Sequence, residues 1–81
     1  MAELTMEEFE NKCMDIIEKI VCISPKQTRT QAIAVAEKML ETAKTKTSKK
    51  SVLDIYERVV HEFKIATDEE YNMLRKQIFS E

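Results

Sequence analysis

The residues of this chain with the most obvious chemical potential are one histidine, His61, and two cysteines, Cys13 and Cys22. A hydroxyl or thiol nucleophile needs a neighbouring general base, most often histidine. A zinc site needs three or four cysteine, histidine or carboxylate ligands in compact spacing. The three residues lack such spacing, and His61 follows Glu57 by one helical turn on a charged stretch. We therefore predict no metal site and interpret His61 as a solvated surface residue.

Neighbouring carboxylates, the usual pair for acid–base catalysis, occur at Glu7 and Glu8 and again over 68–70. Catalysis would require a cleft that keeps one acid away from water. Both clusters instead lie where helices are expected to begin, and there acids stabilise the positive end of the helix dipole. The absence of glycine from the sequence also excludes the P-loop, the dinucleotide-binding fingerprint and the EF-hand loop. We expect neither enzymatic activity nor a cofactor.

A basic run over 44–50 is the strongest candidate for ligand contacts. It combines lysines with threonine and serine and contains no acid, so it could hold phosphates through salt-sensitive contacts that ignore base sequence. Lys26 and Arg29 would contribute if they lie nearby. No aromatic residue or arginine interrupts the run, and the net charge of the chain is −2. A solvated loop is therefore preferred, with nucleic-acid binding as the alternative. The lysines are Lys44, Lys46, Lys49 and Lys50.

The elements that must position these residues are helices. The 81 residues suffice for one domain, 1–81, and contain no glycine and one proline. Tight hairpin turns depend on glycine to reach positive φ, whereas the abundant Ala, Leu, Met, Glu, Lys and Gln favour helices. The sequence thus predicts an all-α bundle of about four helices. Their expected ranges are 6–23, 29–44, 51–64 and 68–79.

Capping residues and apolar spacing set these boundaries. Thr5, Ser51 and Thr67 are expected N-caps, and the second helix begins after either Ser24 or Thr28. Apolar residues of the first helix recur at steps of three and four, which indicates one buried stripe. Its members are Met6, Phe9, Cys13, Ile16, Ile20 and Ile23.

The two cysteines are expected to be free thiols. They are nine positions apart on the first helix, which separates them by ~13 Å, beyond the ~7 Å that a disulfide spans between Cα atoms. Free thiols fit a reducing compartment. No apolar run approaches the ~18 residues of a membrane span. We therefore expect a cytoplasmic protein with no membrane contact.

The last two expected helices and their short link invite a helix-turn-helix interpretation. A DNA-reading helix presents its N-terminal residues to the major groove. Here those residues are Asp68, Glu69 and Glu70, which would repel phosphates. This hairpin is therefore a weak alternative route to nucleic-acid binding.

The preferred functional hypothesis is protein–protein interaction, because in so small a domain some of the apolar helix surface can stay exposed until a partner covers it. The alternative is that the four helices cover one another's apolar faces. The partner would be another protein or a second copy of this chain. Apolar residues at the margins of the stripes are the expected contacts. They are Met14, Val21, Ile33, Leu53 and Met73.

In size and composition the chain resembles small regulators of phages, plasmids and bacterial operons, such as anti-sigma factors, inhibitors, immunity proteins and antitoxins. The resemblance is one of general character and carries no motif. It implies an adaptor, inhibitor or regulator, of transcription among other processes, and assigns no residue.

Overall fold

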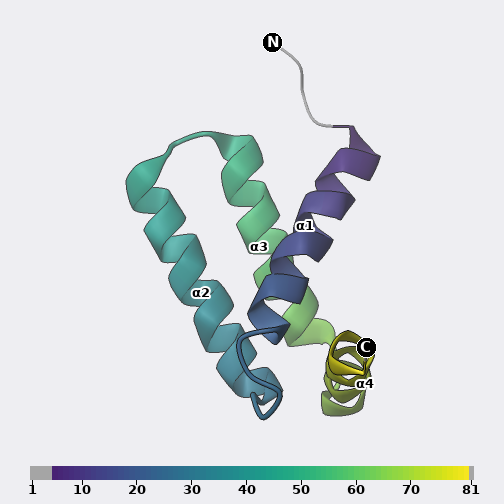
Figure 1. Cartoon of the computed structure of the whole chain (residues 1–81). Helices are drawn as coiled ribbons and strands as arrows, with labels where there is room; N and C mark the ends of the chain where they lie inside the picture. Colours follow the sequence, from purple (N-terminus) through teal and green to yellow (C-terminus); the bar gives the residue numbers. More distant parts are fainter. Residues whose placement is uncertain (1–4, 81) are drawn as a thin grey trace.

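The computed structural model describes residues 5–80, which form four helices and no strand. They are α1 (Met6–Val21), α2 (Arg29–Lys46), α3 (Lys50–Ile65) and α4 (Asp68–Phe79). Helices α2 and α3 form an antiparallel pair, α1 crosses α3, and α4 lies across the end of the bundle where α3 finishes (Figure 1). The all-α prediction is confirmed.

Three of the helices begin with a reciprocal capping box, in which a threonine hydroxyl and a side chain three residues later satisfy free backbone N–H groups. The threonines are Thr5, Thr28 and Thr67. The structure thus decides between the two possible starts of α2 in favour of Thr28. Ser24 instead closes a turn, its hydroxyl accepting a hydrogen bond from the Lys26 amide at 3.1 Å.

The prediction of a loop over 44–50 is wrong. Helix α2 continues to Lys46 and α3 begins at Lys50, so only 47–49 lie between them. Lysine is a good helix former, and this allows α2 to extend. The prediction that Ser51 caps this helix is also wrong. The N-cap of α3 is Lys49, whose side chain makes no capping hydrogen bond among the described residues. The Thr47 hydroxyl accepts from the Lys49 amide at 3.1 Å and so closes the turn before Ser51 is reached.

Helix α1 ends two residues before its expected limit at 23. The Ile23 amide donates to the Ile20 carbonyl at 3.2 Å, a tighter turn of the kind that finishes many helices. Ile23 is exposed as a result, and so is Met6 at the other end of the stripe. The buried part of α1 is therefore its middle and C-terminal half, centred on Ile17 and Ile20.

One cluster of buried side chains joins all four helices. Small alanines on α2 let it approach α3 closely, while branched and aromatic residues fill the space toward α1 and α4. The buried members are Cys13, Ile17, Ile20, Val21, Ala32, Ala36, Ile55, Val59, Val60, Phe63 and Tyr71. No helix within residues 5–80 combines the length and apolar character needed to cross a membrane.

Helix α4 is held in place by polar contacts to the segment between α1 and α2 and to the first residue of α2. The buried side-chain amide of Gln27 donates to the Ile20 carbonyl at 2.9 Å and to the Tyr71 hydroxyl at 3.1 Å. Arg75 donates to the Gln27 carbonyl at 2.9 Å. Arg29 pairs with Asp68 at 2.8 Å and donates to the Phe63 carbonyl at 3.2 Å. These contacts orient α4 across the end of α1 and α3.

Candidate partner-binding groove

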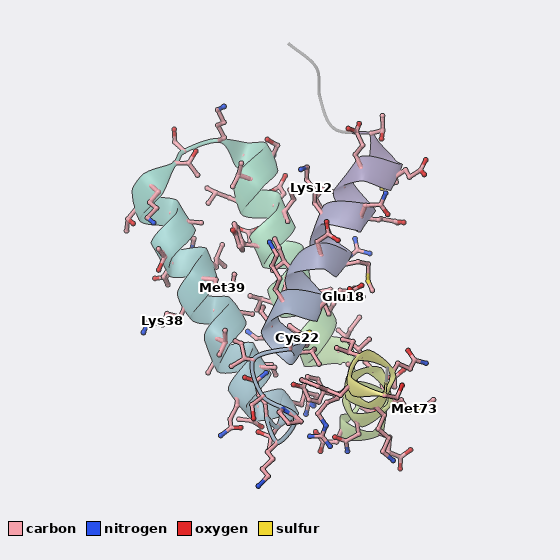
Figure 2. The ribbon with its side chains drawn as sticks, viewed as in Figure 1. Lys12, Glu18, Cys22, Lys38, Met39 and Met73 are labelled. Atoms are coloured by element: carbon pink, nitrogen blue, oxygen red, sulfur yellow. The ribbon has the colours of Figure 1, made fainter. Side chains whose placement is uncertain are left out.

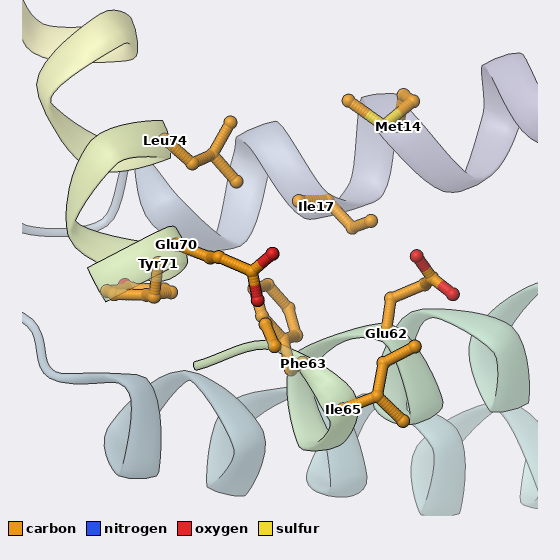
Figure 3. A pocket seen from close by; sticks show the side chains of 9 residues that line it. Met14, Ile17, Glu62, Phe63, Ile65, Glu70, Tyr71 and Leu74 are labelled. Carbon is orange, nitrogen blue, oxygen red and sulfur yellow. The ribbon is translucent and has the colours of Figure 1, made fainter. Parts of the chain in front are cut away.

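A hollow of about 310 Å³ opens where α1, α3 and α4 meet. Figure 3 shows Met14 and Ile17 of α1 along one side, Phe63 and Ile65 of α3 on the other, and Leu74 of α4 closing one end. The remaining lining residues are Glu62, Ala66, Glu70 and Tyr71.

A second hollow of about 180 Å³ continues the first one along α1 and α3. The two share Met14, Ile17 and Glu62, and the second extends to Phe9 and Glu10. From Phe9 to Ile17 the axis of α1 rises by ~12 Å. We name the combined surface the α1–α3–α4 groove. It is elongated and mainly apolar.

Two large apolar side chains of this groove remain in contact with water. Met14 is 45% exposed and Ile65 is 60% exposed. Ile65 is the last residue of α3, and the chain then turns at Ala66 to begin α4. Ala66 and Phe63 both line the hollow beside Ile65.

Negative charge surrounds the apolar lining. The carboxylates of Glu62 and Glu70 face the hollow from α3 and α4 (Figure 3), and Glu10 lies at the far end. Arg58 is the only basic side chain among the described lining residues, and it pairs with Glu62 at 3.1 Å. Glu70 accepts a hydrogen bond from the Thr67 amide at 2.8 Å. The groove thus has more negative than positive charge.

The thiol of Cys13 lines the inner wall of this groove. It donates to the Ile55 carbonyl at a sulfur–oxygen distance of 3.9 Å. Burial is the main reason that the pKa of Cys13 is raised above its ordinary value. The thiol therefore stays protonated near neutral pH and is a poor nucleophile. The expectation that Cys13 is a small core residue is confirmed.

The groove reaches the few hundred Å³ typical of small-molecule pockets, so its size alone does not argue against catalysis. Its described lining residues do not include His61, which is exposed on α3. Within residues 5–80, no three histidine, cysteine or acidic side chains gather as metal ligands would. The expectation that the protein is not an enzyme stays a prediction.

The five predicted partner contacts do not form one surface. Met14 lines the groove. Val21 is wrong as a contact residue, because it is fully buried at 0% exposure in the core. Ile33 and Leu53 are half-buried on α2 and α3, and Ile33 packs against the core. Met73 is exposed, but it points away from α1 and α3 (Figure 2).

The basic run over 44–50 is split between two helices. Lys44 pairs with Glu41 within α2 at 3.4 Å. Lys46 borders a separate hollow of about 380 Å³ between α2 and α3. Lys49 and Lys50 are exposed at the start of α3. Arg29 lies at the opposite end of α2, ~25 Å from Lys46 along its axis, so Arg29 and the neighbouring Lys26 do not join this group.

The groove residues that sequence reasoning missed are Ile65, Glu62, Glu70 and Leu74. The sequence places Ile65 in the short link between the expected helices 51–64 and 68–79, and Glu70 among the acids at a helix start. The available signal was Ile65, a large apolar residue at the end of a helix, followed by the small Ala66. Whether Ile65 is buried or exposed depends on the direction of α4, which the local sequence does not encode.

Comparisons with protein-family models, with curated proteins and with solved structures found no match for this chain. The groove itself is therefore the basis for a function.

Proposed function

We propose that this protein is an interaction module that binds a partner, either another protein or a second copy of this chain, through the α1–α3–α4 groove, and thereby acts as an adaptor, inhibitor or regulator. The observation that supports it is the exposure of Met14 and Ile65 beside a concave apolar lining. Exposed apolar surface that is rimmed by polar groups is typical of partner-binding sites.

The shape of the groove fits the mode in which an amphipathic helix of the partner lays its apolar face between two helices. Met14 has an unbranched, adaptable side chain that can adjust to a partner. Phe63, Tyr71 and Leu74 would form the floor. Contacts at the centre of such a site usually dominate the binding free energy.

We also propose a cytoplasmic location. Both cysteines, Cys13 and Cys22, are free, and Cys22 is exposed. An exposed free thiol persists best in a reducing compartment.

Affinity capture from an extract of the source cells, with paired variants, tests this function. The groove pair, Met14→Gln with Ile65→Gln, removes exposed apolar surface without changing charge. Its matched control, Ile23→Gln with Met73→Gln, does the same at exposed residues outside the groove. We expect the control pair to retain the partner and the groove pair to retain about tenfold less or none.

A partner that is retained equally by the groove pair would contradict the proposal. Loss of the partner with Met73→Gln alone would move the site to the outward face of α4. Circular dichroism of each variant checks that helicity is unchanged. A loss of binding can then be distinguished from a loss of folding.

Nucleic-acid binding remains the second candidate. Its support is that Lys46, Lys49 and Lys50 lie around the start of α3, which has no acid in its first turn. The helix 3–helix 4 hairpin is the weaker route, because Asp68 pairs with Arg29 and α4 begins with three acids. A gel shift at low salt that disappears when Lys44, Lys46, Lys49 and Lys50 become glutamine would favour this function. A shift that ignores those changes would argue against it.

A further inference from the structure

We propose that the occupant of the α1–α3–α4 groove is a basic amphipathic helix of another protein, and not a second copy of this chain. The inference rests on the proposed function, and it adds the chemistry of the partner. Its basis is the pairing of an elongated apolar lining with an excess of carboxylates.

The carboxylates are placed where a bound helix would carry its polar side chains. Glu62 and Glu70 border the hollow on two different helices (Figure 3). Glu18 follows Met14 by one turn of α1 and is exposed on the same face. The single basic lining residue, Arg58, already has Glu62 as its partner. A lysine or arginine flanking the apolar stripe of the ligand would be attracted from both sides.

A twofold dimer through this groove would be disfavoured by the same charges. In such a dimer each copy presents the same patch, so the glutamates of one copy would face those of the other. Like charges across an interface oppose association.

Three other surfaces of a second copy do not fit either. The basic run over 44–50 contains no apolar side chain to fill the groove. Helix α4 exposes Met73 and Phe79, but it begins with Asp68, Glu69 and Glu70. The hollow between α2 and α3 is concave, and a hollow cannot occupy a groove.

The test uses the full chain and two synthetic peptides of about 15 residues, enough for four helical turns. Both are built on alanine with leucines at helical spacing. One peptide has lysines beside the leucines and the other has glutamates. Fluorescence anisotropy measures their affinity at low salt, and amide chemical shifts of the labelled protein locate the site. We expect the lysine peptide to bind and to shift Met14, Ile17, Ile65 and Leu74, and the glutamate peptide not to bind.

Charge-specific variants separate local attraction from overall charge. Glu62→Gln with Glu70→Gln keeps side-chain size, and glutamine can also serve in the capping box of Thr67. The control, Glu41→Gln with Glu57→Gln, makes the same change in net charge at exposed positions outside the groove. We expect the groove variant to bind the lysine peptide on the order of fivefold to tenfold more weakly and the control to bind as the wild type does.

Several results would overturn the inference: no binding of the lysine peptide, equal binding of both peptides, or equal effects of the two charge variants. Sedimentation showing a dimer that Met14→Gln and Ile65→Gln dissociate would also overturn it, while the proposed function of the groove would survive. If the lysine peptide binds but Met14→Gln with Ile65→Gln leaves its affinity unchanged, the proposed function itself fails.

Discussion

Cys13 and Cys22 are the same residue type nine positions apart, and their surroundings give them different chemistry. Cys13 lies among core side chains with its thiol directed to the Ile55 carbonyl. Cys22 caps the end of α1 and is exposed. Sequence reasoning anticipated this difference, because Cys13 falls on the apolar stripe and Cys22 does not.

We expect a thiol reagent to modify Cys22 quickly and Cys13 on the order of a hundredfold more slowly in the folded protein. Thiolate is the reactive form; burial raises the pKa of Cys13, which keeps its thiolate rare, and it also limits access of the reagent. Reaction progress curves of the wild type and of Cys22→Ser measure the two rates. Equal rates in the folded state would show that Cys13 is accessible.

Glu8 provides a pH-dependent contact at the start of α1. Its carboxylate accepts a hydrogen bond from the Thr5 amide, and its own amide donates to the Thr5 hydroxyl. Chiefly because of the backbone contact, the pKa of Glu8 is lowered below its ordinary value. A folded-state pKa below the unfolded one means that this carboxylate stabilises the fold above the unfolded-state value. That contribution is lost as the pH falls through the folded-state pKa.

Replacing Thr5 tests this contact. In Thr5→Ala the hydroxyl no longer holds the first turn in its capped geometry, so we expect the pKa of Glu8 to rise toward its ordinary value. Side-chain carboxyl NMR shifts, followed over a titration from neutral to acidic pH, measure it. An unchanged pKa in Thr5→Ala would mean that the capping box does not determine the titration of Glu8.

At the scale of elements, the position of α4 depends on one buried polar side chain. Gln27 joins the end of α1, through the Ile20 carbonyl, to Tyr71 of α4. Among the described residues, no buried side-chain nitrogen or oxygen lacks a partner. The polar groups around Gln27 are therefore all hydrogen-bonded, and removing one side chain leaves its partners without a hydrogen bond.

We expect Gln27→Ala to destabilise the protein by about 1–3 kcal/mol, the usual penalty for leaving a buried polar group unsatisfied. Tyr71→Phe should cost less, and the two effects should not add, because both remove the same hydrogen bond. Urea unfolding of the two single variants and the double variant gives the coupling. The exposed Gln77→Ala should stay within about 0.5 kcal/mol of the wild type, and a Gln27→Ala effect as small would contradict this account.

At the connection between α2 and α3 the helix boundaries were predicted wrongly. A run of lysine, threonine and serine has no apolar periodicity, and such a pattern predicts a loop. Lys44 and Lys46 nevertheless continue α2, and the Lys44–Glu41 contact supports that last turn. The turn closed by Thr47 and Lys49 marks where α2 ends and α3 begins. A polar run without apolar periodicity does not indicate that position.

At the scale of the whole molecule, stability and binding depend on different residues. Ile20 is 1% exposed at the centre of the core, whereas Met14 and Ile65 lie on its outer edge. We expect Ile20→Ala to lower the free energy of unfolding by about 2–4 kcal/mol. Against a total of roughly 4–12 kcal/mol for a chain of this size, that is a large fraction.

The groove pair Met14→Gln with Ile65→Gln should change the free energy of unfolding by about 1 kcal/mol or less, because exposed side chains contribute little to the core. Urea unfolding of the pair beside Ile20→Ala checks this. A larger loss in the groove pair would mean that these side chains belong to the core and not to a binding surface.

The sequence by itself determined the local features of this protein. Helical composition, the three threonine caps and the apolar steps of α1 act within a few residues of one another, so their outcome can be deduced without the fold. The starts of α1 and α4, the confirmed four-helix class and the different burial of Cys13 and Cys22 follow from them. The choice of Thr28 over Ser24 as the cap of α2 did not.

Only the tertiary structure decided which apolar residues are covered. Val21 and Met14 both lie at margins of the same predicted stripe, yet Val21 is buried and Met14 is exposed. The difference arises because α4 covers one end of α1 and leaves a groove beside the rest, and the direction of α4 depends on contacts as distant in sequence as Gln27 with Tyr71. The groove that supports our proposals is a product of that long-range packing.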